Sequence, residues 1–345
     1  MKPNNILRKI AVLCLVGALA VLTLTAPALA LAQAQDPLPS WNEGPAKQAI
    51  VSFVQKVTDK SNPAYVPPAE RIATFDQDGT LWVEQPLYTQ AMFSLDRVHA
   101  LAAQHPEWKT EQPFKAVLGN DREAMARFTE QDWAQIIGAT HAGMTTEAFL
   151  KTTGEWLAQA KHPRFKRPYT ELVYQPMLEV MQYLRDNGFK TYIVTGGGQE
   201  FVRVYSERVY GVPPEQVVGS SIATRYEYQD GKPVLMRLPK VFFIDDKAGK
   251  PIGINLLLGK RPVAAFGNSG GDREMLEYTG AGSGTRLMML ILHDDAKREY
   301  AYGPAGGLPD TRVGAFSQAL LDEAKKRGWV VITMKKDFKK VFPWE

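Results

Sequence analysis

Two aspartates, Asp76 and Asp78, are separated by one residue and directly follow an apolar run at residues 72–75. The run is typical of a buried strand, and Gly79 permits a tight turn that brings both acids to the carboxyl end of that strand. Open α/β sheets form their ligand crevices at such ends. Two carboxylates there can act as a nucleophile and as an acid/base catalyst. An ordinary acidic turn has the same composition, so the pair alone leaves both interpretations open.

A second predicted strand, residues 190–195, ends in a hydroxyl and three glycines. Thr195, Gly196 and Gly197 come before a stretch with a helical pattern, residues 199–210. Glycines allow backbone amides to approach an anion closely, a helix N-terminus favours negative charge, and the threonine adds a hydroxyl donor. This order of residues indicates a phosphate-binding loop, and a plain glycine turn is the alternative.

A third apolar run, residues 261–267, leads to Asn268 and Asp272 just before a predicted helix. The side-chain oxygens of these two residues are suitable ligands for a hard cation such as Mg²⁺. The same segment contains a Gly-x-Ser-x-Gly pattern around Ser269, which is found at the nucleophile of serine hydrolases. We disfavour that alternative, because the only later histidine is His293 and Asp272 is too close along the chain to complete a triad.

A lysine that can neutralise phosphate stands close to this third run. Pro251 suits the first position of a helix, which places Lys250 at the entrance of that helix. Lys247 lies three residues earlier and serves the same purpose if the loop is arranged differently, but we favour Lys250. Three strand ends that each supply one part of a phosphate and magnesium site are hard to explain as coincidence.

With these segments in this order, the chain resembles the haloacid dehalogenase-like (HAD) superfamily. The four motifs of that superfamily are similar to residues 76–80, Thr195, Lys250 and 267–272, and the resemblance extends over about residues 69–280. In layout the chain resembles the phosphoserine phosphatases of the superfamily, which carry a helical C1-type cap. The resemblance implies an α/β fold, a doubly wound Rossmann-like parallel sheet with an inserted α-helical cap domain.

The resemblance also implies roles for the catalytic residues. Asp76 looks like the nucleophile that forms an aspartyl-phosphate, and Asp78 like the acid/base that protonates the leaving oxygen and then activates water. Thr195, the glycines that follow it and Lys250 would bind the transferring phosphoryl group. The acid at position 78 favours a phosphatase over a dehalogenase, because a departing halide needs no proton.

A magnesium site is implied in the same way. The ion would be held by the Asp76 carboxylate, the Asp78 backbone carbonyl and Asp272, with water and substrate oxygens completing an octahedron. Asn268 departs from the family pattern, since many members have an aspartate there, and we expect Asp272 more than Asn268 to be a direct ligand. Glu84 would receive an ammonium group of the substrate, as an acidic residue after the first motif does in phosphoserine phosphatases.

The N-terminal residues 1–32 have the features of a secretory signal peptide. Lys2, Arg8 and Lys9 precede an apolar run that ends in small residues. A periplasmic or secreted protein without stable membrane association is therefore expected, and a retained membrane anchor is the alternative. The chain has 41 basic and 37 acidic residues, so removal of these three leaves one net positive charge, which calls for no nucleic acid partner. Cys14 is the only cysteine, so no disulfide or thiol nucleophile is expected in the mature protein.

The predicted organisation after the signal peptide has three parts. These are an N-terminal helical lead at 33–68, a core domain at 69–86 and 169–345, and a helical cap domain at 87–168. The predicted function is Mg²⁺-dependent hydrolysis of a small phosphomonoester through an aspartyl-phosphate. A phosphotransferase or phosphomutase is the first alternative, and a non-catalytic phosphate-binding protein is the second.

Overall fold

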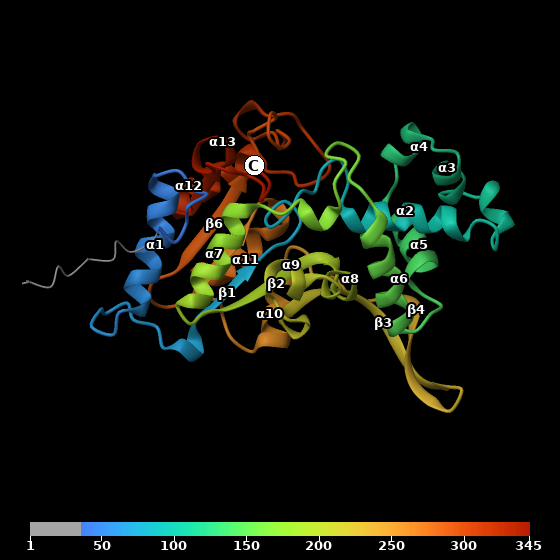
Figure 1. Cartoon of the computed structure of the whole chain (residues 1–345), viewed down its shortest axis with the longest axis horizontal. Helices are drawn as coiled ribbons and strands as arrows, with labels where there is room; N and C mark the ends of the chain where they lie inside the picture. The colour runs from blue at the N-terminus through green and yellow to red at the C-terminus, as the bar shows by residue number, and fades with distance from the viewer. Residues whose placement is uncertain (1–35) are drawn as a thin grey trace, which may run out of the picture. The chain divides into compact units, whose positions relative to one another are not determined.

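The structure, a computed structural model, describes residues 36–345, of which residues 37–345 form one unit built around a seven-stranded sheet. The strand order is β4-β3-β2-β1-β5-β6-β7 (Figure 1). β3 and β4 pair antiparallel, and the other neighbours pair parallel. This confirms the predicted doubly wound α/β sheet. The strands are β1 (Ile72–Phe75), β2 (Lys190–Gly198), β3 (Val217–Gln229), β4 (Lys232–Phe243), β5 (Ala264–Gly267), β6 (Leu287–Leu292) and β7 (Val330–Thr333).

Helices cover both faces of the sheet. One hydrophobic cluster joins a face of the sheet to α1 (Pro45–Thr58), α7 (Gln175–Asp186), α8 (Gln199–Arg203) and α9 (Ser206–Tyr210). A second cluster joins the other face to α10 (Gly249–Leu258), α11 (Arg273–Gly280) and α12 (Gln318–Arg327). A last short helix, α13 (Met334–Asp337), follows β7. Parallel strands whose two faces are both covered in this way lie in a dry interior.

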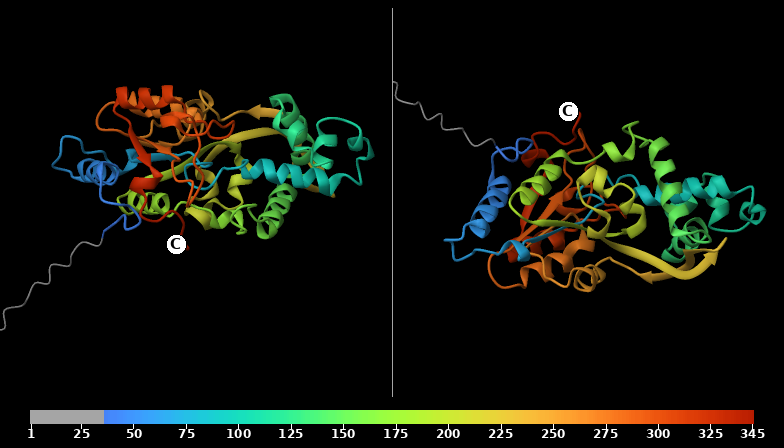
Figure 2. Two further views of the ribbon diagram at one scale, coloured as in Figure 1. Left: turned by 90° about the horizontal axis from the view of Figure 1, so that it is seen from above. Right: turned by 60° about the horizontal axis from the view of Figure 1, so that its bottom comes forward.

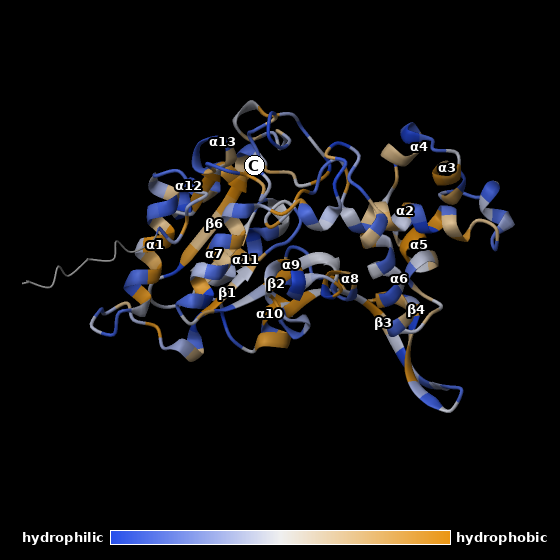
Figure 3. Ribbon diagram, in the orientation of Figure 1, coloured by the Kyte–Doolittle hydropathy of each residue, from blue (hydrophilic) through white to orange (hydrophobic). Residues whose placement is uncertain are grey.

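The alternation of side chains along the central strands explains why there are two clusters. In β5, Phe266 packs into the cluster of α1 and α7, whereas its neighbour Ala265 packs into the cluster of α10 and α11. β6 does the same with Met289 and Leu290, and the whole strand carries hydrophobic residues (Figure 3). Successive residues of a strand point to opposite faces, so a continuous apolar run is what a doubly covered strand requires.

A helical segment separates β1 from β2 in the chain. It contains α2 (Thr89–Leu101), α3 (Phe114–Leu118), α4 (Arg122–Ala126), α5 (Glu130–His141) and α6 (Thr146–Gln159). Thr129 caps α5 in a reciprocal capping box with Asp132, and Thr145 caps α6 through the amide of Ala148. The segment has a hydrophobic cluster of its own, which includes Trp108 and Ile136.

The β3–β4 hairpin links the sheet to this helical segment. Figure 2 shows the hairpin running from the sheet to the helices. Met236 of β4 forms a bridge with Thr145 at the start of α6, and the amide of Arg237 donates to the carbonyl of Met144 at 2.9 Å. The two strands are long, 13 residues in β3 and 12 in β4, so the hairpin extends well beyond the sheet.

Two other local predictions differ from the structure. The helix predicted at 199–210 is divided into α8 and α9 at Tyr205, and Pro251 occupies the third position of α10 instead of the first. Single-turn 3₁₀ helices complete the elements, at Pro68–Glu70, Pro106–Lys109, Tyr169–Glu171, Pro214–Gln216, Gly270–Asp272 and Ala305–Gly307.

The predicted signal peptide lies outside the described residues. Among residues 36–345, no helix combines the length and the apolar character that crossing a membrane requires.

Candidate active site

The acid loop, residues 76–84, begins where β1 ends and the strand order reverses. β1 lies between β2 and β5, from which the sheet grows in opposite directions, so a crevice is expected at their carboxyl ends. The Asp76 amide donates to the Phe266 carbonyl at 2.9 Å, and the Leu81 amide donates to the Gln77 carbonyl at 2.8 Å. These bonds curl the chain so that the acids stay at the end of the strand.

Gly79 is the residue on which the tight packing of this loop depends. Its φ is +75°, a conformation that costs little only for glycine. A Cβ atom at this position would lie 2.1 Å from Nδ2 of Asn268 and 2.4 Å from Oε1 of Glu84. The loop therefore contacts the residues after β5 directly through its backbone.

Lys250 joins two of the predicted acids. Its ammonium Nζ donates to Oδ1 of Asp76 and to Oδ1 of Asp272, both at 2.6 Å, and to the carbonyl of Val194 at 2.9 Å. Burial alone would lower the pKa of this lysine, but the carboxylates of Asp272 and Asp76 outweigh burial and raise the pKa above its ordinary value. The structure brings Lys250 to Asp76, whereas Lys247 is exposed.

Asp76 is buried and surrounded by more acid than base. Burial raises the pKa of its carboxyl well above the ordinary value, the charge of Asp272 raises it further, and Lys250 opposes both. The Thr80 hydroxyl lies 3.3 Å from Oδ2 of Asp76 and 3.3 Å from Oδ1 of Asn268. One hydroxyl has one proton, so it cannot donate fully to both oxygens. Two buried, incompletely satisfied oxygens thus lie on either side of Thr80.

Asp78 has a different environment from Asp76. Its Oδ1 accepts a hydrogen bond of 2.6 Å from the indole Nε1 of Trp82. Burial raises the pKa of Asp78 to about 6, while the Trp82 hydrogen bond and the Lys250 charge limit the rise. A carboxyl with a pKa near the operating pH can both give and take a proton.

Asp272 is engaged by protein donors at both carboxylate oxygens. Oδ1 accepts from Lys250, and Oδ2 accepts from the amides of Asn268 at 2.9 Å and Ser269 at 3.1 Å. Ser269 in turn caps the short helix that contains Asp272. Asp272 therefore orders the loop after β5 and positions the lysine.

Glu84, the last residue of the acid loop, is buried. Its Oε1 accepts from Asn268 Nδ2 at 2.7 Å and from the Tyr302 hydroxyl at 2.8 Å, and burial raises the pKa of its carboxyl well above the ordinary value. The ring of Tyr302 stacks on that of His293, whose Nε2 lies 2.8 Å from the Gly79 carbonyl. Nδ1 of the same histidine lies 3.1 Å from Oε2 of the buried Glu299. Through these contacts, His293 and Glu299 hold the carbonyl of Gly79 in the turn of the acid loop.

Thr195 and the glycines that follow it form the opposite side of the site. The Thr195 hydroxyl accepts from the amide of Gly197 at 3.0 Å, and a Cβ at Gly197 would lie 3.9 Å from Oδ2 of Asp78. The next amide, that of Gly198, donates to Oε1 of Gln90 at 2.6 Å. Gln90 belongs to α2, so the helical segment contacts the glycine loop directly.

A metal site among these residues would need backbone carbonyl or side-chain amide oxygens in addition to carboxylates. Within residues 36–345, no three His, Cys, Asp or Glu side chains are arranged to hold a metal ion. Oδ2 of Asp76 and Oδ1 of Asn268, which both lie 3.3 Å from the Thr80 hydroxyl, are oxygens of the kind that bind a hard cation.

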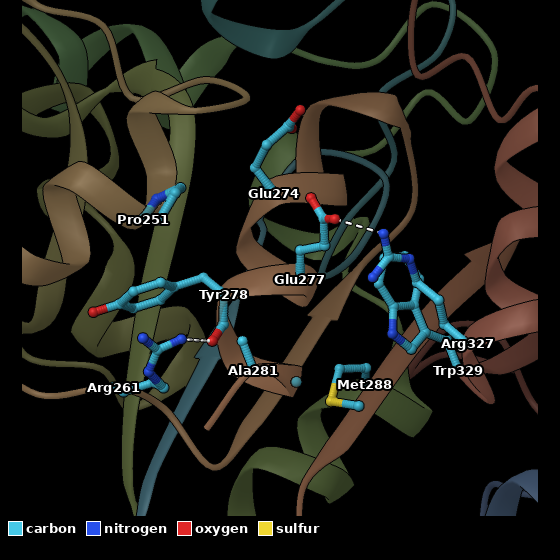
Figure 4. Close-up of a pocket in the computed structure, with 10 residues that line it drawn as sticks. Pro251, Arg261, Glu274, Glu277, Tyr278, Ala281, Met288, Arg327 and Trp329 are labelled. Carbon is cyan, nitrogen blue, oxygen red and sulfur yellow. Dashed lines mark hydrogen bonds and ion pairs between the residues drawn. The ribbon is translucent and has the colours of Figure 1, made fainter. Parts of the chain in front are cut away.

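A sizeable surface pocket lies away from these acids. It is lined by α11 and by residues of α10, β6, the end of α12 and the connecting segments, and it contains one ion pair (Figure 4). Arg327 Nη2 lies 2.6 Å from Oε1 of Glu277, and Arg261 donates to the carbonyl of Tyr278. None of its lining residues belongs to the predicted site.

Sequence patterns identified the acids, the lysine and the glycine loop, but not the residues that hold them. Trp82, Gln90, His293 and Tyr302 reach the site or its support from positions without a motif. Of these residues, Trp82 is the one that the sequence could have suggested, because it follows Asp78 by only four residues.

Comparison with known proteins gives a family match and distant structural likenesses. The model for haloacid dehalogenase-like hydrolases matches residues 73–277. No curated protein matches. A conserved, functionally unknown protein from Anaerococcus prevotii DSM 20548 is 18% identical with a TM-score of 0.47, covering 71% of this chain and 85% of that chain. A protein of unknown function from Bordetella pertussis Tohama I is 20% identical with a TM-score of 0.45, covering 76% and 98%. A phosphoserine phosphohydrolase-like protein from Francisella tularensis subsp. tularensis SCHU S4 is 14% identical with a TM-score of 0.34, covering 65% and 87%.

Proposed function

Because this chain belongs to the haloacid dehalogenase-like hydrolase family, we propose that it is a Mg²⁺-dependent phosphatase that hydrolyses a small phosphomonoester through an aspartyl-phosphate on Asp76. One observation carries the proposal. The Lys250 ammonium is bonded to Asp76 at the end of the central strand, and a second carboxyl, Asp78, lies two residues further on. A buried nucleophile beside a fixed cation and an independent acid suits phosphoryl transfer, which depends mainly on positioning and electrostatics.

The reaction proceeds in two displacements. In the first, a carboxylate oxygen of Asp76 bonds to phosphorus while the ester P–O bond breaks, and Asp78 gives its proton to the departing oxygen. In the second, Asp78 takes a proton from water as the water oxygen attacks phosphorus, which releases phosphate and restores the Asp76 carboxylate. The raised pKa of Asp78, about 6, suits a group that must be protonated in one step and ionised in the other.

We propose Asp76, the Asp78 carbonyl and Asn268 as the residues that hold Mg²⁺. When bound, the ion would offset the negative charge of the phosphoryl group and of the buried carboxyls. The incompletely satisfied oxygens of Asp76 and Asn268 support this choice. Asp272, which we expected to be a direct ligand, accepts three hydrogen bonds from protein donors and positions Lys250, and its Oδ1 keeps one acceptor site for the ion, so we retain it as a proposed ligand.

The phosphoryl group would be bound by the glycine loop and by Lys250, whose ammonium donates to three protein oxygens and would exchange one of these bonds for a bond to phosphate. Because the Thr195 oxygen accepts from the Gly197 amide, its own proton is available to donate to a phosphate oxygen. The amides of Gly196 and Gly197 lie in the last residues of β2, which continues through the predicted loop to Gly198, and the Gly197 amide donates to the Thr195 hydroxyl. The helices that follow β2 begin directly after this loop, which favours a negative charge there.

The expected role of Glu84 changes in this proposal. Its carboxyl is only 2% exposed and holds Asn268 and Tyr302, so it is poorly placed to meet an ammonium group of the substrate. We propose that Glu84 orients the Asn268 amide, whose oxygen then faces Thr80. A phosphorylated amine is therefore not favoured over other phosphomonoesters as substrate.

Phosphate release by the protein lacking residues 1–32 tests the function. The assay uses p-nitrophenyl phosphate and a panel of phosphomonoesters, with Mg²⁺ or with chelator, and compares wild type with Asp76→Asn. Loss of the nucleophile is expected to reduce release about 10³-fold or more. Asp186→Asn, at the exposed end of α7, is the matched control and should retain full activity. Absence of release from every ester, or release that survives Asp76→Asn, would overturn the proposal.

A further inference from the structure

The hydrogen bond from Trp82 to Asp78 gives this tryptophan a part in the reaction. Its indole Nε1 lies 2.6 Å from Oδ1 of Asp78, and the side chain is 1% exposed. We infer that Trp82 is a positioning residue that selects which oxygen of the acid/base carboxyl exchanges the proton with the substrate. The inference rests on the proposed phosphatase function and concerns one step of it, protonation of the leaving oxygen.

The indole is held firmly in place on two sides. Its ring stacks on that of Tyr205, with 4.9 Å between centroids and an angle of 23° between the planes. The Tyr205 hydroxyl accepts from Nε2 of Gln77 at 2.6 Å, which ties the stacking partner to the acid loop as well. The backbone carbonyl of Trp82 accepts from the Gly79 amide at 2.9 Å. Ring and backbone are therefore both fixed relative to Asp78.

The chemistry of an indole decides what this bond does. Indole Nε1 is a donor and cannot accept. Oδ1 of Asp78 is therefore committed as an acceptor, and a proton carried by this carboxyl belongs on Oδ2. Oδ2 faces the glycine loop, because a Cβ atom placed on Gly197 would lie 3.9 Å from it. The proton is thus presented toward the place where the phosphoryl group is proposed to bind.

Substrates with different leaving groups separate this role from a structural one. A p-nitrophenolate ion is stable without a proton, whereas an alkoxide leaves only with protonation, so a misdirected acid slows cleavage of an alkyl phosphate selectively. The parameter to compare is kcat/KM, because it reports the steps up to formation of the aspartyl-phosphate and excludes its hydrolysis. The two substrates are p-nitrophenyl phosphate and glycerol 2-phosphate, measured with saturating Mg²⁺.

The variant is Trp82→Phe, which keeps an aromatic ring against Tyr205 and removes the donor. We expect kcat/KM to fall about 10- to 100-fold for the alkyl ester and less than about threefold for the aryl ester, since full proton transfer is worth about 10²- to 10⁴-fold. Asp78→Asn sets the upper limit and should lower the alkyl-to-aryl ratio further. Trp41→Phe is the matched control, because Trp41 is equally buried and donates its Nε1 to the Pro176 carbonyl at 3.0 Å, away from the site.

A second variant, Tyr205→Leu, covers the case in which Trp82→Phe does not fold. It keeps the indole but removes its stacking partner, and the alkyl-to-aryl ratio should fall by a smaller factor in the same direction. Equal losses on both esters, or an unchanged ratio in both variants, would overturn the role of Trp82 while leaving the phosphatase function intact. A wild-type protein that cleaves neither ester would overturn both.

Discussion

The loops at the carboxyl ends of the strands and the helical segment at 87–168 differ in how tightly their polar groups are held by buried partners. In the loops, Lys250 and Asp272 are each held by several buried partners; Lys250 donates to Asp76, Asp272 and the Val194 carbonyl. The helical segment has its own hydrophobic cluster and contacts the glycine loop through one amide, that of Gln90. The contrast indicates that the acid loop and Lys250 are fixed mainly by the core. The helical segment joins that core through Phe93, Phe149 and Leu157 and contacts the glycine loop by one hydrogen bond.

Replacement of Lys250 is expected to have the largest effect. Lys250→Met leaves two buried carboxyls without their shared cation, so the unfolding free energy should fall by about 3–5 kcal/mol. Phosphate release should fall about 10³-fold or more, because one donor to a transferring group is worth about 10²–10³ and the nucleophile is also disturbed. Urea unfolding and kinetics measure both effects. Lys247→Met, three residues earlier and exposed, should change neither by much; equal effects of the two variants would refute the assignment.

The two regions should also respond to pH in opposite directions. Burial raises the pKa of Asp78 to about 6, so its folded state holds a proton that the unfolded chain releases, and its contribution to stability decreases as the pH rises from about 4 to 6. Burial lowers the pKa of His141, in α5, to about 3. The unfolded chain then takes up a proton that the folded protein excludes, so the contribution of His141 is lost as the pH falls below about 6.5.

His141→Asn tests the second half of this contrast. Without the buried imidazole, the loss of unfolding free energy between pH 6.5 and 4.5 should be smaller than in wild type by about 2–3 kcal/mol. Urea unfolding in the presence of chelator measures it at both pH values. His99→Asn, at an exposed position of α2, provides the comparison. A wild-type loss that persists unchanged in His141→Asn would show that the histidine is not the responsible group.

The smallest effect is expected at the contact between the two regions. Gln90 accepts from the Gly198 amide, and its Nε2 lies 3.1 Å from Nε2 of His141. Gln90→Leu removes both bonds, so the unfolding free energy should fall by about 1 kcal/mol. The glycine loop loses an anchor, and KM should rise roughly three- to tenfold with a smaller change in kcat. Gln182→Leu, on the exposed face of α7, is the control. A change in kcat alone would argue that the contact serves the chemistry and not binding.

The sequence was sufficient to predict the features that depend on short stretches of chain. The apolar runs before Asp76, Thr195 and Asn268 are strands because each is buried on both faces, and polar residues directly after such runs necessarily collect at one edge of a parallel sheet. Helices α7 and α12 likewise carry apolar residues that recur on one face, a periodicity that short stretches of sequence display.

The features that sequence reasoning missed depend on long-range contacts. The contact of Asp272 with Lys250 depends on the backbone amides of Asn268 and Ser269, which orient the carboxylate, and their positions follow from packing. The same holds for Glu84, whose Oε1 would lie 1.7 Å from a Cβ at Gly314, a residue 230 positions later in the chain. Distances of this kind leave no pattern in a single sequence. The expected ammonium-binding role of Glu84 therefore rested on its position after the motif alone.

The long β3–β4 hairpin changes how the helical segment can move. Two chain crossings, near residues 87 and 168, would by themselves permit free hinge motion, but the hairpin adds a third connection, because β4 is paired in the sheet at one end and with Thr145 at the other. Closure of the helices over the site must therefore bend a two-stranded ribbon. The register of that ribbon is interrupted around Ile222, where the ladder is weakest. Such bending costs energy, so the paired ribbon opposes displacement of the helices from the position that the structure shows.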